Sequence, residues 1–182
     1  MASFLMLAMV FTYSNTVYAQ ESEDYNMWES IMLTPDNTNL KTLGTNMRKH
    51  NETYHQEGPY NAMVYNITTG LNAGKMIWQM GPMMFKHNDA RPADGGHDED
   101  WRDNVMSYIK KMHTIEYWTQ DDKKSNVSML AGPEVKCPIL FMRYFEIEMD
   151  HGYTVNNHFK QVSETIKSME GDHPWGIFYK VI

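Results

Sequence analysis

The chain has 182 residues, of which 42% are hydrophobic and 21% charged, and this composition excludes a disordered, collagen-like or coiled-coil protein. Its net charge of -7 argues against nucleic-acid binding, because phosphate contacts need clustered Lys and Arg. A single cysteine, Cys137, excludes a disulfide framework and a Cys-rich zinc site.

The N-terminus is typical of a secretory signal peptide. Residues 2–11 are apolar and uncharged, and Val17, Tyr18 and Ala19 precede Gln20 in the manner of a cleavage site. The apolar run is too short for a membrane-spanning helix, which takes about 20 residues. We therefore expect removal of residues 1–19 and a mature protein that is secreted or periplasmic and does not bind a membrane.

The next segment predicts a strand, a helix and a pair of strands. Residues 25–33 have the aromatic and branched content of a strand, and residues 60–69 and 75–80 are strands joined by a Gly- and Asn-rich turn. Between the strands at 25–33 and 60–69, we expect a helix at residues 40–57, because apolar residues recur there at steps of three and four, which marks one face of a helix. The residues of that stripe are Leu40, Leu43, Met47, His50 and Tyr54.

A second helix and strand complete an α+β unit. Asp98, Glu99 and Asp100 suit the first turn of a helix, where exposed N–H groups favour negative charge. The apolar stripe of this helix is Trp101, Val105, Tyr108 and Met112. A strand at residues 114–119 follows, so the predicted order is β-α-β-β-α-β, the ferredoxin-like arrangement.

The pattern then restarts and stops early. After a polar connector at residues 121–137, a strand at 138–149, a helix through 155–169 and a strand at 175–182 are expected. We interpret residues 20–120 as a first ferredoxin-like unit and 138–182 as a partial second one. Its last strand would lack a partner, and an open strand edge favours self-association.

Three segments resemble a known group of proteins. They are residues 55–60 (HQEGPY), 74–82 (GKMIWQMGP) and 98–101 (DEDW). In this order they resemble the dimeric α/β-barrel superfamily, and within it the NIPSNAP-like proteins, over residues 25–119 and more weakly over 138–182. The resemblance implies two ferredoxin-like sheets paired into a pseudo-dimeric barrel. The superfamily includes cofactor-free oxygenases, haem-degrading enzymes, haem peroxidases and members with no established activity, so the fold does not decide the function.

His50 is the most informative candidate site residue. It lies on the apolar stripe of the first helix, so it should face the sheet, either as a hydrogen-bonded core histidine or as a ligand-facing group. With Tyr54 it forms the candidate catalytic pair, and Trp78 and Trp101 are candidate ligand-binding residues. Arg143, in the apolar strand, pairs either with Glu29 or Glu116 or with an anionic ligand.

His55 and the loop before the second helix offer further histidines. Five residues on a straight helix place side chains about 140° apart, so we expect His55 to be a surface residue that shares no metal with His50. The loop at residues 87–100 contains His87, Asp89 and His97, a candidate set for a divalent metal. A solvated loop is the alternative for this segment.

The sequence leaves three functions open, and we rank them. An exported protein that binds a small molecule or haem between helix and sheet, with possible oxygenase-like oxidoreductase activity, ranks first. The alternatives are a non-catalytic binding or assembly module, and a metal-binding protein using the loop at 87–100. The commonest hydrolase, P-loop and dinucleotide-binding motifs do not occur in the sequence.

Overall fold

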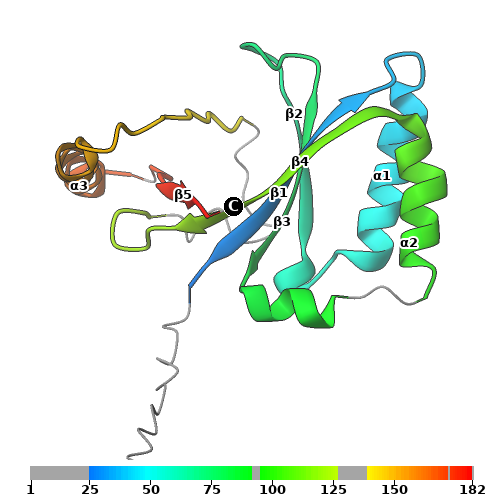
Figure 1. Cartoon of the computed structure of the whole chain (residues 1–182), viewed down its shortest axis with the longest axis horizontal. Coiled ribbons are helices and arrows are strands. Elements are labelled where there is room, and N and C mark those ends of the chain that lie inside the picture. Colours follow the sequence, from blue (N-terminus) through cyan, green and yellow to red (C-terminus); the bar gives the residue numbers. More distant parts are fainter. Residues whose placement is uncertain (1–24, 92–94, 127–138, 172, 182) are drawn as a thin grey trace, which may run out of the picture.

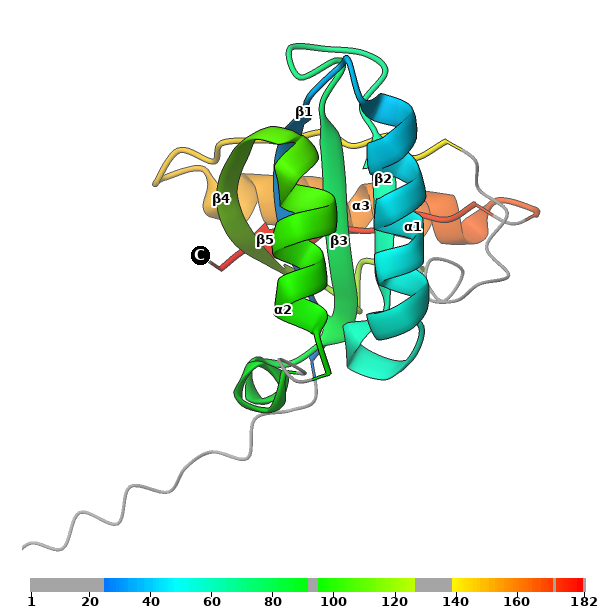
Figure 2. The ribbon, with the colours of Figure 1, turned by 90° about the vertical axis from the view of Figure 1, so that its right-hand side faces the viewer.

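The computed structural model describes residues 25–91, 95–126, 139–171 and 173–181. The expected signal peptide and Cys137 lie outside the described residues. The chain forms an α+β structure with a five-stranded antiparallel open sheet (Figure 1). Two helical segments cover one face of this sheet, and the C-terminal helix lies on its other side (Figure 2).

The sheet has the strand order β2-β3-β1-β4-β5. Its strands are β1 (Met27–Pro35), β2 (Ala62–Asn66), β3 (Met76–Met83), β4 (Ile109–Gln120) and β5 (Phe178–Lys180). Central β1 pairs antiparallel with β3 on one side and with β4 on the other. With a helix between β1 and β2 and another between β3 and β4, the first four strands are compatible with a ferredoxin-like unit.

Helix α1 (Leu40–Tyr54) packs its apolar stripe on the sheet as the spacing predicts. Leu43, Met47 and His50 are its buried residues. The turn before it is held by Asp36, whose carboxylate accepts hydrogen bonds from the backbone and hydroxyl of Thr38 and from the amide of Asn39. The core between α1, the second helical segment and the sheet consists of Met27, Ile31, Leu33, Leu43, Met47, Met76, Trp78, Met80, Met83 and Val105.

The second helical segment is shorter than the sequence predicts. One turn of α-helix, α2 (His97–Asp100), continues as a π-helical turn at Trp101–Val105 and a 3₁₀ turn at Met106–Tyr108. The predicted fourth stripe residue, Met112, instead lies in β4, opposite Leu33 of β1. The expected start of this strand at residue 114 was wrong, because the ladder with β1 already pairs the backbone from Ile109 onward.

The C-terminal part differs most from expectation. Residues 139–148 form no strand, and their large apolar side chains are exposed, so the predicted strand over 138–149 was wrong for the part that the structure describes. The sheet edge beside β4 is taken by β5, which pairs with Trp118, Thr119 and Gln120. Helix α3 (Gly152–Ser168) forms close to its predicted position. Across the described ranges, no helix has the length and apolarity to cross a membrane.

Candidate functional site

Three histidines from separate parts of the chain meet where α1, α2 and the sheet come together. His50 lies in the last turns of α1, His55 follows the end of that helix, and His97 is the first residue of α2. One ring nitrogen from each lies within 4.8 Å of the other two. His50 is fully buried, His55 is 3% exposed and His97 is partly buried.

In each of these imidazoles, Nδ1 forms a hydrogen bond with an oxygen acceptor. His50 Nδ1 lies 2.8 Å from Oδ2 of Asp100, and His97 Nδ1 lies 2.7 Å from Oδ1 of Asp98. His55 Nδ1 lies 2.9 Å from the backbone oxygen of Tyr60. A carbonyl oxygen or an ionised carboxylate only accepts hydrogen bonds, so Nδ1 carries a proton in all three rings, and in a neutral ring Nε2 then presents its lone pair.

The Nε2 atom of each ring is therefore left without an oxygen acceptor. Nε2 of His55 and Nε2 of His97 are 3.0 Å apart, and Nε2 of His50 is buried without any hydrogen-bond partner. Two lone pairs at this distance repel unless a proton or a cation lies between them. Imidazole nitrogens that are each about 2.0–2.1 Å from one tetrahedral zinc ion would be roughly 3.3 Å apart.

Burial keeps two of these histidines neutral near neutral pH. It lowers the pKa of His55 to about 4, against a smaller opposing effect of the hydrogen bond to Tyr60. Burial also lowers the pKa of His50, although its hydrogen bond to Asp100 opposes this. Neutral imidazole is the form that binds a metal ion.

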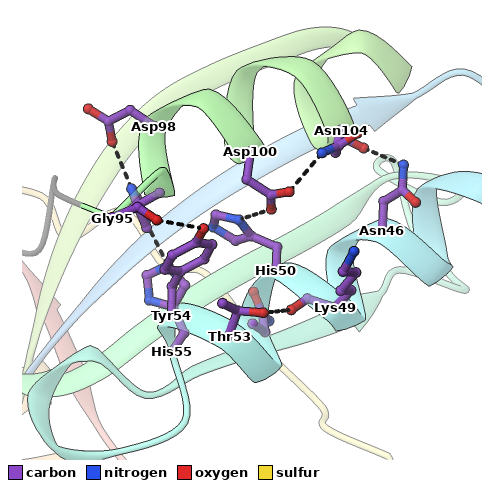
Figure 3. A network of polar contacts seen from close by, with 12 residues as sticks. Asn46, Lys49, His50, Thr53, Tyr54, His55, Gly95, Asp98, Asp100 and Asn104 are labelled. Carbon is purple, nitrogen blue, oxygen red and sulfur yellow. Dashed lines mark hydrogen bonds and ion pairs between the residues drawn. The ribbon is translucent and has the colours of Figure 1, made fainter.

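Asp100 is held as a carboxylate beside His50. Burial by itself raises its pKa, but hydrogen bonds from Asn104 and His50 outweigh that effect and lower it. The amide of Asn104 reaches Oδ1 of Asp100 at 2.7 Å, and the backbone oxygen of Asn104 accepts a hydrogen bond from Asn46 of α1 (Figure 3). This chain of contacts ties the two helical segments together beside the histidines.

The predicted ligand-binding aromatics surround the cluster. The ring centroid of Trp78 is 5.1 Å from that of His55, and Trp101 is 5.1 Å from His50. Tyr54 lies 5.1 Å from His50 and 5.2 Å from His97, and its hydroxyl donates to the backbone oxygen of Gly95 (Figure 3). The structure thus brings together five predicted site residues, namely His50, Tyr54, Trp78, Trp101 and, from the predicted loop set, His97.

His55 was assigned wrongly as a surface residue. A rotation of about 100° per residue holds only inside a helix, and α1 ends at Tyr54. His55 has φ -134° and ψ 38°, so its backbone has left the helix and its side chain turns inward to Tyr60 and His97. The sequence feature that could have indicated this is Gly58 and Pro59 just beyond His55, since they show that the helix ends within a few residues of it.

The predicted metal set of the loop is not brought together. Of its members only His97 joins His50 and His55. Among the described residues, His87 and Asp89 belong neither to this cluster nor to the exposed group of Glu148, Asp150 and His151. The ring of His87 accepts a hydrogen bond from the backbone N–H of Met84 and closes the 3₁₀ turn at Phe85–Ala90. Gly95 and Gly96, both with positive φ, make the turn that leads His97 into α2.

Arg143 does not take the predicted inward position. It is exposed, and its guanidinium lies 5.2 Å from the ring centroid of Phe141. Both expected partners have other cations, since Glu29 pairs with Arg91 and Glu116 pairs with Lys180. Arg143 was placed inward only because residues 138–149 were expected to form a strand, and the described residues 139–148 form none.

No protein-family model, no curated protein and no solved structure matches this chain.

Proposed function

We propose that this chain is a metal-binding protein in which Nε2 of His50, His55 and His97 hold one divalent transition-metal ion. The observation that carries the proposal is the arrangement of the three rings. Each has Nδ1 on an oxygen, the Nε2 atoms of His55 and His97 face each other, and Nε2 of His50 is buried without a partner. Histidines that bind metals regularly donate the other ring N–H to a carboxylate or a carbonyl, which fixes the tautomer and the ring.

The donor set favours zinc or a neighbouring transition metal over calcium or magnesium. Three imidazole nitrogens suit Zn²⁺, Cu²⁺, Ni²⁺ or Fe²⁺, whereas hard cations prefer oxygen ligands. This site takes the place of the metal site expected in the loop at residues 87–100, and His97 is the one residue that belongs to both. Haem is less well supported, because nitrogens that converge within 4.8 Å and are packed between Trp78 and Trp101 suit a single ion rather than a porphyrin.

The test is metal binding by the full chain after dialysis against a chelator. Isothermal titration with Zn²⁺ should give one site per chain, and His50→Gln, His55→Gln and His97→Gln should each weaken it strongly. His158→Gln, at an exposed position on α3, is the matched control and should bind as the wild type does. Zinc at 100 times its Kd should stabilise the wild type by about 2.7 kcal/mol. The proposal fails if zinc does not bind, or if the three variants bind as well as the control.

A second candidate is a self-associating module of the pseudo-dimeric barrel type. It is favoured by the apolar side chains of residues 139–149, which project from the part of the chain after β4 and are exposed, Ile139 by 83% and Phe141 by 76%. A contiguous exposed apolar segment is typical of an interaction surface. This candidate is compatible with the metal site, which lies on the α1 and α2 side of the sheet.

A further inference from the structure

Among the described residues, the histidine cluster supplies three donors and no fourth. Among residues that the structure describes, no Cys, Asp, Glu or further His joins the group of His50, His55 and His97. The nearby carboxylates of Asp98 and Asp100 are engaged on the Nδ1 side of the rings, away from the converging Nε2 atoms. Zinc is four-coordinate in most protein sites, and a site with three protein ligands keeps its fourth position for water or substrate.

Aromatic side chains limit the space around that fourth position. Trp78 is 2% exposed and packs edge-on against both His55 and Trp101, so it closes the side toward the sheet. Tyr54 is half-buried and lies against the rings of two proposed ligands, His50 and His97.

Tyr54 also contacts the turn that delivers His97. Its hydroxyl donates to the backbone oxygen of Gly95 at 3.2 Å, two residues before His97, as Figure 3 shows. The next residue, Gly96, has φ +87°, and a Cβ there would lie 3.5 Å from the Tyr54 hydroxyl. Tyr54 is thus a partly exposed side chain of α1 that contacts both His97 and the turn before α2.

We propose that the fourth position of the metal takes a small exogenous donor, namely water, hydroxide or a small anion, and that Tyr54 sets the upper limit on its size. This inference rests on the proposed metal function. It assigns Tyr54 as a specificity-determining residue beside the metal. An ion with an exchangeable water in such a site has the arrangement of a Lewis-acid centre rather than of a closed structural one.

The experiment uses the full chain loaded with Co²⁺, whose visible absorption reports the coordination of the ion. Azide is the small probe and benzoate the large one, and both are anions of charge -1. The variants are Tyr54→Ala, which removes the ring, and Tyr54→Phe, which retains it without the hydroxyl. Tyr153→Ala, at an 80% exposed tyrosine of α3, is the matched control.

Azide should change the cobalt spectrum of the wild type in a saturable way. Benzoate should bind about tenfold or more tightly to Tyr54→Ala than to the wild type, as expected when a ring that fills the space is removed. Tyr54→Phe and Tyr153→Ala should treat benzoate as the wild type does.

Two results would overturn the inference. A wild-type spectrum that azide leaves unchanged would mean that the fourth position is closed, and this arm does not depend on any variant folding. Equal benzoate affinity in the wild type and Tyr54→Ala would mean that Tyr54 sets no limit. Failure of the wild type to bind Co²⁺ at all would instead refute the proposed metal function.

Discussion

At the residue scale, the site depends on which ring nitrogen of each histidine forms a hydrogen bond with an oxygen. Asp98, Asp100 and the carbonyl of Tyr60 hold the three Nδ1 atoms, and this leaves the three Nε2 atoms without an oxygen acceptor inside one cluster. Such an arrangement is costly without a cation, because a buried acceptor without a partner loses its hydration. The unpartnered Nε2 of His50 is the clearest sign of this cost.

Asp100→Asn should lower the affinity for zinc by roughly 10–100-fold, because the carboxylate orients His50 and makes it a stronger donor. The amide can still contact Asn104, so the fold should persist. Titration calorimetry of the purified variant measures the change. Asp103→Asn, at an exposed carboxylate paired with Arg102, is the control and should bind zinc normally. An unchanged affinity in Asp100→Asn would show that this carboxylate does not support the site.

A second residue-scale prediction concerns Glu29, which is fully buried in β1. Its carboxylate accepts hydrogen bonds from Arg91 at 2.8 Å and from the hydroxyl of Tyr117 at 3.0 Å. Removing one partner of a buried ion pair leaves an uncompensated charge. Because Arg91 is 35% exposed, solvent reduces the loss, and we expect Arg91→Met to cost about 2–3 kcal/mol of unfolding free energy.

The matched comparison is Lys180→Met, which breaks the more exposed pair with Glu116 and should cost less than about 1 kcal/mol. Urea denaturation of both variants measures the difference. Equal losses would mean that the buried position of Glu29 makes no difference to its ion pair.

At the element scale, the ends of the helices position the site. The end of α1 at Tyr54 frees His55 to turn inward, and the glycine turn before α2 places His97 opposite it. The tight turn from β1 into α1 sets where this helix begins, and Asp36 holds that turn through Thr38 and Asn39.

Acid should destabilise the fold through this turn. Hydrogen bonds from the backbone of Thr38, then from the side chains of Asn39 and Thr38, lower the pKa of Asp36 to about 2. An unfolded aspartate has a pKa near 3.9. The folded value is the lower one, so the stabilisation is complete above about pH 4 and is lost as the pH falls toward about 2.

Asp36→Asn should therefore lower stability near neutral pH and make it less dependent on pH between about 4 and 2. Urea midpoints measured at several pH values for the wild type and the variant give the comparison. Parallel pH profiles would show that Asp36 makes no contribution to acid sensitivity.

At the scale of the whole molecule, the two sides of the sheet differ. One side carries α1, α2, the packed core and the histidines, and the other faces α3 (Figure 2). The segment at residues 139–149 carries large apolar side chains that are exposed, which is unfavourable in water.

We expect the protein to self-associate through this segment. Light scattering at micromolar concentration should report a dimer or larger species, and the double variant Phe141→Ser with Phe145→Ser should shift it toward the monomer. Leu71→Ser replaces an exposed apolar residue of the β2–β3 turn and should have no such effect. A monodisperse wild-type monomer would contradict the expectation.

The local patterns in the sequence determined much of the first unit. Spacings of three and four residues gave α1 and its buried face, including His50, and acidic residues marked the start of α2. These features depend on residues within one or two helical turns of each other. The periodicity of apolar residues and the residue types at helix ends therefore indicate them. The aromatic residues around His50 were found for the same reason, since each sits on a regular face.

Only the tertiary structure decided the histidine cluster and the C-terminal region. His97 is 42 residues from His55, and their meeting depends on how α2 returns across the sheet beside α1. The direction of His55 depends on backbone angles just past a helix end, which no periodic pattern encodes. Residues 138–149 have the apolar content of a strand buried on both faces, yet a strand needs a partner edge, and β5 takes the edge beside β4.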